Sequence, residues 1–487
     1  MTDTLTPVKP ARLIINGEAV DSASGQTFTT VNPATEEPIC AVAEAGVEDV
    51  DRAVQAARAA FDDGPWPKMK PAERQRVLWK LGDLILAHGD ELGRLETLDN
   101  GKPIFEARQI DVPMVAGCFH YFSGWATKLT GETVPVNPGT FTYTLREPLG
   151  VVGAIIPWNF PMIMVGWKCA PALAAGNTVV LKPAMETPLT AVRIGELALE
   201  AGLPPGVLNI VPGRGSVAGE ALVRHPLVDK ISFTGSTEVG QRIMREAAGT
   251  VKKLTLELGG KSPNIVFADA DQEAAVRGAS TGIFYGKGEV CAAGSRLLVE
   301  HSIHAEFVAK LAERAKKLVP ADPLDPKTRL GSLVNEKQMK TVLGYVETGV
   351  KEGARIVVGG QRQPVNGKGW FVQATVLDRV DNRMKVAQEE IFGPVLAVIP
   401  FDDADDAVRK ANDIPFGLAA GVWTGDLKKA HTVARRLRAG TVWVNMYNFY
   451  DPGMPFGGTK ASGFGRDLGA DSLRDYTQVK SVWINIE

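Results

Sequence analysis

The sequence predicts an α/β protein with a doubly wound parallel sheet. From Gly150 onward, short apolar runs rich in β-branched residues alternate with helical segments that end near glycine or proline. Parallel strands need crossover helices, so this alternation favours a parallel, Rossmann-like sheet. A second series starts after Gly259 and predicts a second α/β lobe. Ligands of such sheets bind beyond the carboxyl ends of the strands.

The first elements follow from apolar spacing. Residues 12–17 predict a strand, and apolar positions three and four apart predict amphipathic helices over residues 50–61 and 77–95. Five strands are then expected in the first lobe, at residues 151–156, 178–182, 207–211, 230–233 and 254–258. In the second lobe we expect strands at residues 296–300, 371–377, 395–401 and 441–445, and helices at 304–318 and 426–438.

Two segments stand apart from this alternation. Residues 140–146 alternate strictly between apolar and polar side chains after a turn signal at Asn137-Pro138-Gly139, and residues 481–486 also predict a strand. They indicate either an interaction arm or ordinary edge strands.

Composition excludes several classes. The chain has 487 residues, enough for two to four domains, and its 54 Lys plus Arg nearly balance its 56 Asp plus Glu. No basic surface is expected, so a nucleic-acid partner is excluded. Residues 148–167 carry no charge, but their prolines predict a strand, a break and a helix start instead of a membrane span. Without an apolar signal segment near the N-terminus, a cytoplasmic protein is expected.

The four cysteines are too widely spaced for a disulfide framework or a metal site. Cys291 lies among small residues that would let a substrate approach its sulfur, although a buried structural cysteine is an equally simple interpretation. Glu257 ends the fifth predicted strand. Burial there would raise its pKa toward the range of a general base, unless it is only an ion-pair partner.

Two loops complete the candidate chemistry. Asn159 stands between Pro157 and Pro161, where a rigid loop would hold its amide as an oxyanion donor or as a simple turn residue. Residues 233–240 follow the fourth strand and open a helix, which is a typical phosphate site. The glycine-rich run at 213–219 has one residue too many for a dinucleotide fingerprint and is interpreted as a turn.

Seven spaced motifs resemble the signature segments of the aldehyde dehydrogenase superfamily, in the same order, and most closely those of broad-specificity class 1/2 enzymes. The motifs are PWNFP at 157–161, LKP at 181–183, FTGSTEVG at 233–240, LELGGKSP at 256–263, GKGEVCAAGSR at 286–296, QEEIFGPV at 388–395 and PFGGTKASGFGR at 455–466. The resemblance covers the chain from about Leu13 to its end.

The resemblance implies an oxidoreductase that converts an aldehyde to the free acid through a thiohemiacetal and a thioester. It implies Cys291 as nucleophile, Asn159 as oxyanion donor, Glu257 as the base that activates water, and Lys168 as part of a proton relay. Asp467 stands where relatives often carry glutamate in that relay, and its shorter carboxylate is expected to weaken the link. No metal is implied.

The resemblance also implies an NAD site and an aldehyde channel. The implied cofactor-binding residues are Ile156, Pro157, Trp158, Lys182, Met185, Gly215, Phe233, Gly235, Ser236, Gly259, Glu390 and Phe392. The implied channel residues are Met114, Phe160, Met164, Trp167, Tyr285, Val290, Ala292, Tyr450 and Phe456. Met185 replaces a glutamate common in NAD-using members, and a thioether does not repel a 2′-phosphate, so NADP use stays open. The apolar channel favours aliphatic or aromatic aldehydes.

By resemblance, the expected domains are a dinucleotide-binding domain at 1–125 and 149–259, a catalytic domain at 260–465 and an oligomerisation arm at 126–148 and 466–487. The arm would pair across subunits, so a homodimer or homotetramer is expected. Two alternatives stay open. One is an enzyme that passes the thioester to coenzyme A, against which the presence of Glu257 argues. The other is a non-enzymatic binding or structural protein on this fold.

Overall fold

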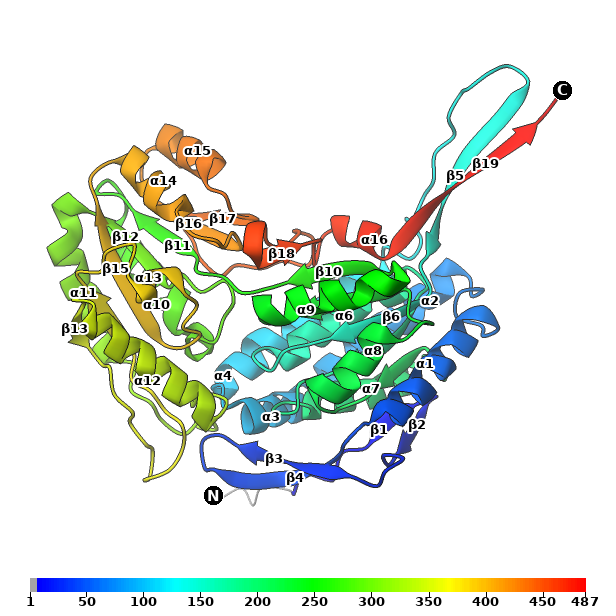
Figure 1. Ribbon diagram of the computed structural model, residues 1–487, viewed down its shortest axis with the longest axis horizontal. Coiled ribbons are helices and arrows are strands. Elements are labelled where there is room, and N and C mark those ends of the chain that lie inside the picture. The colour runs from blue at the N-terminus through cyan, green and yellow to red at the C-terminus, as the bar shows by residue number, and fades with distance from the viewer. Residues whose placement is uncertain (1–6) are drawn as a thin grey trace.

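The computed structural model describes residues 7–487. It consists of two α/β lobes side by side and a two-stranded ribbon that projects from the first lobe (Figure 1). Each lobe is built on its own sheet, and the chain crosses from the first sheet to the second just after Glu257.

The first sheet has eight strands in the order β18-β10-β9-β6-β7-β8-β1-β2. Its five central strands are parallel, as predicted, and the short edge strands β1, β2 and β18 are antiparallel. The strands are β1 (Leu13–Ile15), β2 (Glu18–Val20), β6 (Val151–Ile155), β7 (Thr178–Lys182), β8 (Leu208–Ile210), β9 (Lys230–Thr234), β10 (Lys253–Glu257) and β18 (Gly463–Phe464). β18 lies inside the range expected for the catalytic domain but pairs with β10 of the first sheet.

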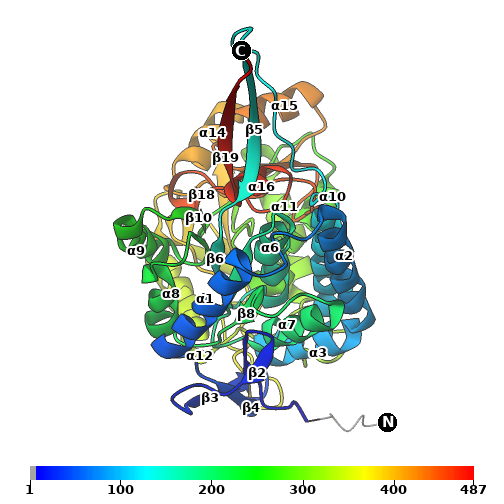
Figure 2. The ribbon, with the colours of Figure 1, turned by 90° about the vertical axis from the view of Figure 1, so that its right-hand side faces the viewer.

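Helices cover both faces of this sheet. Figure 2 shows α1, α8 and α9 on one side of β6 and β8 and α2, α3 and α7 on the other. Successive strand residues alternate between the two cores: Val151 and Ile155 pack on the first side, and Val152 and Ala154 on the second. The helices are α1 (Val47–Asp62), α2 (Pro71–Ala87), α3 (Gly89–Asn100), α4 (Ile104–Glu106), α5 (Val112–Ser123), α6 (Pro161–Ala174), α7 (Leu189–Ala201), α8 (Glu220–Arg224) and α9 (Thr237–Ala247).

The second sheet has seven strands in the order β13-β14-β15-β12-β11-β16-β17, parallel except at β13. The strands are β11 (Pro263–Val266), β12 (Arg296–Glu300), β13 (Arg355–Val358), β14 (Thr375–Asp378), β15 (Val395–Phe401), β16 (Ala419–Trp423) and β17 (Thr441–Val444). The helices of this lobe are α10 (Gln272–Phe284), α11 (His304–Lys316), α12 (Glu336–Lys351), α13 (Lys385–Gln388), α14 (Ala404–Asn412) and α15 (Leu427–Arg436). The short helix α16 (Asp471–Asp475) lies against α6 of the first lobe and β19 (Thr477–Asn485) (Figure 1).

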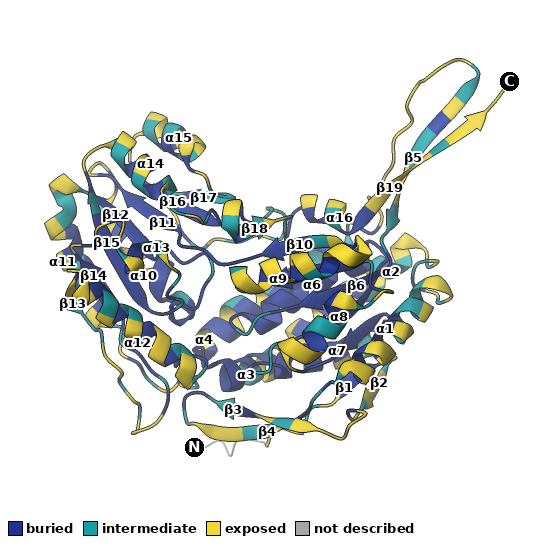
Figure 3. Cartoon of the chain, in the orientation of Figure 1, coloured by how far each residue is buried: buried dark blue, intermediate teal, exposed yellow. Residues whose placement is uncertain are grey.

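Two small ribbons lie outside these sheets. β3 (Thr27–Asn32) pairs with β4 (Glu37–Ala43), and β5 (Thr140–Pro148) pairs antiparallel with β19 (Thr477–Asn485). The β5–β19 ribbon belongs to neither main sheet, so the edge-strand alternative is wrong. Its side chains are largely exposed, Trp483 by 63% (Figure 3). An exposed two-stranded ribbon with apolar side chains is typical of a surface that another chain covers.

Two local predictions are corrected. The helix expected over residues 77–95 is divided into α2 and α3 at His88, where the backbone leaves helical geometry with φ −97° and ψ 19°. The strand expected over residues 371–377 forms only at β14. The uncharged stretch is β6, a loop and the start of α6, as predicted. Among residues 7–487, no helix is long and apolar enough to cross a membrane.

Candidate active site

Cys291 lies on the loop between α10 and β12, half-buried against a cavity of about 370 Å³. Burial raises the pKa of its thiol to about 12, and the nearby charges of Glu390 and Glu257 act in the same direction. The thiol therefore needs a proton acceptor before it becomes an efficient nucleophile.

The cavity is an aromatic compartment. The rings of Trp167 and Phe456 lie 5.2 Å apart, those of Tyr450 and Phe456 5.5 Å, and Phe160 stacks on Tyr285 at 5.9 Å. None of the described residues that line it is charged. Those residues are Ile110, Met114, Phe160, Ile163, Met164, Trp167, Thr281, Tyr285, Val290, Cys291, Tyr447, Asn448, Phe449, Tyr450 and Phe456.

All but one of the channel residues expected from sequence line this cavity. Ala292 does not: it is fully buried, and its carbonyl accepts a hydrogen bond from the Tyr447 hydroxyl at 2.9 Å. A side chain adjacent to Cys291 in sequence points away from it in this loop. Sequence reasoning missed Ile110, Ile163, Thr281, Tyr447, Asn448 and Phe449. Apolar spacing cannot separate such residues from ordinary core.

Glu257 ends β10 and is only 4% exposed. Neither of its carboxylate oxygens has a hydrogen-bond partner within residues 7–487. Burial first, and then the charge of Asp467, raises the pKa of Glu257 well above its usual value. This direction agrees with the sequence expectation. Gly457 makes room for the carboxylate, since a Cβ there would lie 2.5 Å from Oε1.

Lys168, on α6, forms a fully buried ion pair with Asp467. Its Nζ donates to Asp467 Oδ2 at 2.6 Å. The pair lies close enough to Glu257 for both charges to act on the pKa of that carboxyl. The shorter side chain of Asp467 therefore still reaches the lysine, and the contact expected to be weakened is intact.

The loop after β6 fixes Asn159. Its side-chain Nδ2 donates to the backbone carbonyl of Glu289 at 2.8 Å, and the residue is 7% exposed. Asn100, at the end of α3, donates to the carbonyls of Trp158 at 2.7 Å and Asn159 at 3.3 Å. α6 then starts at Pro161, whose fixed φ suits a first helical position. Asn100 and Glu289 were not found from sequence.

A second cavity, of about 400 Å³, opens beyond the carboxyl ends of β6, β7 and β9, where a doubly wound sheet binds its ligand. Eight of the expected cofactor-binding residues line it: Ile156, Pro157, Trp158, Lys182, Gly215, Phe233, Gly235 and Ser236. It is also lined by Ile155, Ala184, Ser216, Gly219, Glu220, Val223, Thr234, Val239, Arg242, Ile243 and Glu246. We call this cavity the cofactor cleft.

The cleft offers groups that suit an anionic dinucleotide. Ser236 caps α9 by accepting a hydrogen bond from the Val239 amide at 3.3 Å, so the start of the helix faces the cleft. Lys182 Nζ donates to the carbonyls of Pro183 at 2.7 Å and Gly213 at 2.9 Å. Burial lowers the pKa of Lys182 to about 8.

Four expected cofactor-binding residues, Met185, Gly259, Glu390 and Phe392, do not line the cleft itself. Glu390 is turned toward the Gly259-Gly260 pair, where its Oε1 accepts a hydrogen bond from the Gly260 amide at 2.9 Å. The ring of Phe392 packs edge-on against Trp158 at 5.2 Å, so it borders the cleft through that side chain. Met185 is half-buried on the loop after β7.

Glycines bring these groups together. A Cβ on Gly259 would lie 2.4 Å from Glu390 Oε2, and one on Gly260 would lie 2.5 Å from the carbonyl oxygen of Cys291. Real Cβ atoms do not approach so closely. The pair therefore seats Glu390 on one side and the Cys291 loop on the other. Burial raises the pKa of Glu390 to about 7.

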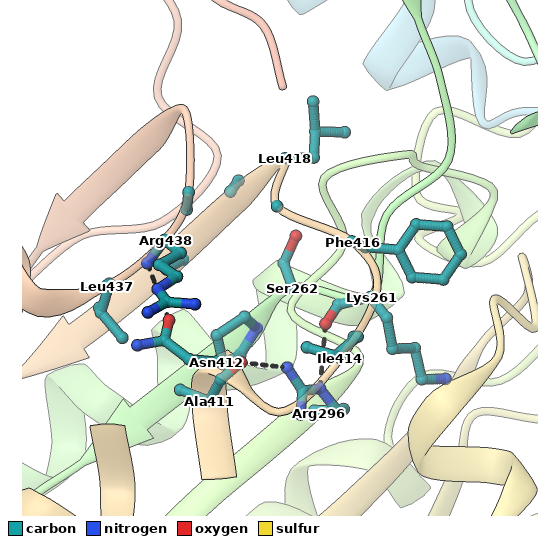
Figure 4. Close-up of a pocket in the computed structure, with 15 residues that line it drawn as sticks. Lys261, Ser262, Arg296, Ala411, Asn412, Ile414, Phe416, Leu418, Leu437 and Arg438 are labelled. Atoms are coloured by element: carbon teal, nitrogen blue, oxygen red, sulfur yellow. Dashed lines mark hydrogen bonds between the residues drawn. The ribbon is translucent and has the colours of Figure 1, made fainter. Parts of the chain in front are cut away.

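The loop that carries Cys291 is anchored at its far end by Arg296. This buried guanidinium donates to the carbonyls of Lys261, Lys410 and Ala411 at 2.8 to 3.0 Å. Figure 4 shows the small cavity beside it, which has a volume of about 10 Å³. That space holds about one water molecule and is too small for a substrate. We therefore assign Arg296 a structural role. Among residues 7–487, no group of His, Cys, Asp or Glu could hold a metal ion.

Comparison with known proteins agrees with this geometry. The aldehyde dehydrogenase family model matches residues 19–482. The structure of an NAD+ complex of aldehyde dehydrogenase from Bacillus cereus superposes with a TM-score of 0.97 at 49% identity and covers 98% of this chain and 97% of that one.

Two curated relatives are similar over the same length. The human mitochondrial aldehyde dehydrogenase is 49% identical over 478 residues, which is 98% of this chain and 92% of that protein. The mitochondrial benzaldehyde dehydrogenase of Antirrhinum majus is 48% identical over 483 residues, covering 98% and 90%. This chain therefore belongs to the aldehyde dehydrogenase family, whose general reaction is the oxidation of an aldehyde to a carboxylic acid.

Proposed function

We propose that this chain oxidises apolar aldehydes to free carboxylic acids, with Cys291 as nucleophile and Glu257 as general base. The carrying observation is the pairing of these two groups. Cys291 lines an uncharged cavity, and the buried carboxylate of Glu257, whose oxygens have no partner within residues 7–487, acts on its pKa. A carboxylate that no hydrogen bond holds in place is free to accept and release protons.

In the first step the thiol proton of Cys291 passes to solvent, and the sulfur forms a bond to the aldehyde carbon. The carbonyl oxygen becomes an oxyanion, which the Asn159 amide and the Cys291 backbone N–H would hold. Bound NAD+ supplies a hydride acceptor. When the hydride and its electron pair leave the carbon, the C=O bond re-forms and Cys291 carries a thioester.

Hydrolysis returns the enzyme to its starting state. Glu257 takes a proton from water, whose oxygen bonds to the thioester carbon. The C–S bond then breaks, the acid leaves, and the thiolate of Cys291 regains a proton from solvent. The buried pair Lys168 and Asp467, 2.6 Å apart, is placed to carry the proton from Glu257 onward. We assign the cofactor to the lobe of residues 1–125 and 149–259, and the nucleophile to the lobe of residues 260–465.

The cavity supports aliphatic or aromatic aldehydes as substrates. Its aromatic rings would stack on a planar ring, and none of its described residues would pair with a substrate carboxylate. A relative of similar length and 48% identity is named a benzaldehyde dehydrogenase. We expect benzaldehyde and hexanal to give a higher kcat/KM than succinic semialdehyde. A preference for the semialdehyde would overturn this substrate class.

NAD+ is the expected cofactor, supported by the NAD+ complex of the Bacillus cereus relative. Met185 removes a carboxylate that would repel a 2′-phosphate, so measurable NADP+ use is expected as well. Met185→Glu should raise the NAD+ to NADP+ ratio of kcat/KM by about tenfold, the effect of one charge pair of order 1.4 kcal/mol. An unchanged ratio would refute the role of position 185.

We propose that the β5–β19 ribbon pairs with another copy of the chain, giving a homodimer or homotetramer. Its exposed apolar residues include Phe141, Leu145, Trp483 and Ile484. Burying such a surface is favourable and is typical of a subunit contact. Light scattering of the purified chain should report a dimer or tetramer. A monomer at micromolar concentration would exclude this assembly.

The decisive test follows reduced cofactor and acid product with an aldehyde panel, with and without coenzyme A. Turnover to free acid without coenzyme A, and its loss in Cys291→Ser, is the expected result. Product that forms only with coenzyme A would favour the acylating alternative. No turnover under any condition would favour the non-enzymatic alternative.

A further inference from the structure

Lys287 lies four residues before Cys291 in an unusual backbone segment. Gly286, Lys287 and Gly288 all have left-handed φ angles, of 55°, 61° and 73°. Glycine adopts these angles freely, but a lysine there is strained and persists only where the surroundings hold it. Lys287 is also 1% exposed, so its ammonium group is removed from water. The strained backbone and the buried charge of Lys287 both cost free energy, so this residue needs a specific explanation.

The ammonium of Lys287 is fully engaged. Nζ donates to the backbone carbonyl of Asn100 at 2.7 Å and to its side-chain Oδ1 at 2.9 Å, and it forms an ion pair with Glu289 Oε2 at 2.7 Å. Two hydrogen bonds and one ion pair therefore hold this ammonium. We call Lys287, Asn100 and Glu289 the Lys287 clamp.

Through Asn100, the clamp orients the loop that carries Asn159. Because Oδ1 of Asn100 accepts from Lys287, its amide Nδ2 must face the other way. That Nδ2 donates to the carbonyls of Trp158 and Asn159. The position of the loop backbone therefore depends on an amide whose orientation Lys287 determines.

Through Glu289, the clamp also reaches the Asn159 side chain. The backbone carbonyl of Glu289 accepts from Asn159 Nδ2 at 2.8 Å, and its Oε1 accepts from the Val334 amide at 3.1 Å. The contacts form a closed ring from Lys287 to Asn100, to the Asn159 loop, to Glu289 and back. Glu289 is two residues from Cys291, so the ring joins the amide to the nucleophile loop.

We propose that Lys287 is a positioning residue for aldehyde oxidation, which fixes the Asn159 amide relative to Cys291 through Asn100 and Glu289. This inference rests on the proposed function, in which Asn159 holds the oxyanion. Stability alone is a weak explanation, because a buried ion pair is often no better than apolar packing of the same volume. The two hydrogen bonds and the ion pair of Lys287 lead to the two segments that must meet at the carbonyl oxygen.

The test is a double-mutant cycle with Lys287→Met and Asn159→Ala. Misplacing a reacting group by about 1 Å can cost on the order of 100-fold, so we expect Lys287→Met to lower kcat/KM by about 30- to 100-fold, mainly through kcat. In the Asn159→Ala background the same change should cost less than about threefold, because the amide it positions is gone. An equal loss in both backgrounds would overturn the proposal.

A second measurement separates positioning from general damage. Alkylation of Cys291 by iodoacetamide forms no oxyanion, so its rate should stay within about twofold of wild type in Lys287→Met. A parallel fall in alkylation would overturn the proposal. Lys287→Met also leaves Glu289 unpaired, so Lys287→Met combined with Glu289→Gln, which buries no net charge, should show the same kcat loss with a native thermal midpoint.

Lys252→Met is the matched control. Lys252 is a buried lysine whose Nζ donates to the His225 carbonyl at 2.7 Å, and it precedes β10 at the end opposite Glu257. We expect its kcat/KM to be unchanged, and a comparable loss in this variant would contradict the proposal. The two levels of hypothesis stay distinguishable: an inactive wild type refutes the proposed function, whereas additive losses in an active enzyme refute only the role of Lys287.

Discussion

Glu257, which is buried, and Glu390, which is half-buried, are two carboxylates near the same thiol, and they differ in their partners. Both act on the pKa of Cys291. Glu390 is held by the Gly260 amide at 2.9 Å, while no hydrogen-bond partner of either Glu257 oxygen lies within residues 7–487. Burial raises the pKa of Glu390 to about 7 and that of Glu257 well above its usual value. A carboxylate fixed by a backbone donor suits binding, and one left free suits proton transfer.

The largest effect should come from Glu257→Gln, which removes the free carboxylate and keeps its shape. We expect steady-state turnover to fall by about 100- to 1,000-fold, the usual contribution of a general base, while a burst of reduced cofactor remains. In the wild type the deacylation rate should rise with pH, because the raised pKa of Glu257 keeps the base protonated at lower pH. Loss of the burst would show that Glu257 is needed before hydride transfer is complete, and not only in hydrolysis.

The next effect should come from Gly259→Ala, which disturbs the held carboxylate. The new Cβ would lie 2.4 Å from Glu390 Oε2, so Glu390 must move. We expect the KM for NAD+ to rise by about tenfold, equivalent to about 1.4 kcal/mol of binding, with a smaller change for the aldehyde. Gly344→Ala is the control, because a Cβ there meets nothing within 4 Å. Equal KM values in both variants would contradict the seating of Glu390 by Gly259.

A smaller effect, measured in the enzyme without bound ligand, should separate the influence of the Glu390 charge on Cys291 from that of the Glu257 charge. Above about pH 7 Glu390 is ionised and raises the pKa of the Cys291 thiol. Glu390→Gln removes this charge, lowers the thiol pKa and increases the thiolate fraction. Alkylation should then be about two- to fivefold faster at pH 8 and unchanged below pH 6, where Glu390 is protonated. Acceleration at both pH values would mean that the charge of Glu390 is not the cause.

The smallest effect should come from Asp467→Glu. Asp467 already reaches Lys168 at 2.6 Å, so a longer carboxylate adds nothing to the pair. We expect kcat within about twofold of wild type, since glutamate keeps the carboxylate that pairs with Lys168. Asp467→Asn is the comparison, because it leaves the buried Lys168 without a counter-charge and should lower the thermal midpoint. A large gain in kcat for Asp467→Glu would show that the relay is limited here.

Fold prediction succeeded where a single local signal decides the outcome. β7, β12 and β15 match their predicted residues because each is a mostly apolar run that is buried on both faces. The break between α2 and α3 was missed, since apolar spacing continues through His88 while the backbone does not. Local signals left the independence of the β5–β19 ribbon open, and only the family resemblance placed its two strands in one arm, because they are more than 300 residues apart.

The site residues predicted from the sequence came from motifs. Residues that only the folded geometry brings to the site were missed. Cys291, Asn159 and Glu257 were nominated from sequence, and the structure places each on a loop or a strand end. Ala292, assigned to the channel by resemblance, does not line the cavity, because adjacency in sequence does not fix the direction of a side chain. The contact of Lys287 with Asn100 spans 187 residues and has no motif. Only the folded chain brings Lys287 to Asn100, whose amide contacts the loop that carries Asn159.

The two compartments each contain a natural fluorophore. Trp167 belongs to the wall of the aromatic cavity, while Trp158 lines the cofactor cleft with its ring against Phe392. An indole's emission responds to what stacks on it, so aldehyde and nucleotide would perturb different emitters. The chain has nine tryptophans, so the emission of each of these two indoles is obtained as the difference between wild type and the Trp158→Phe or Trp167→Phe variant. The order in which the two compartments fill can then be timed without any added label.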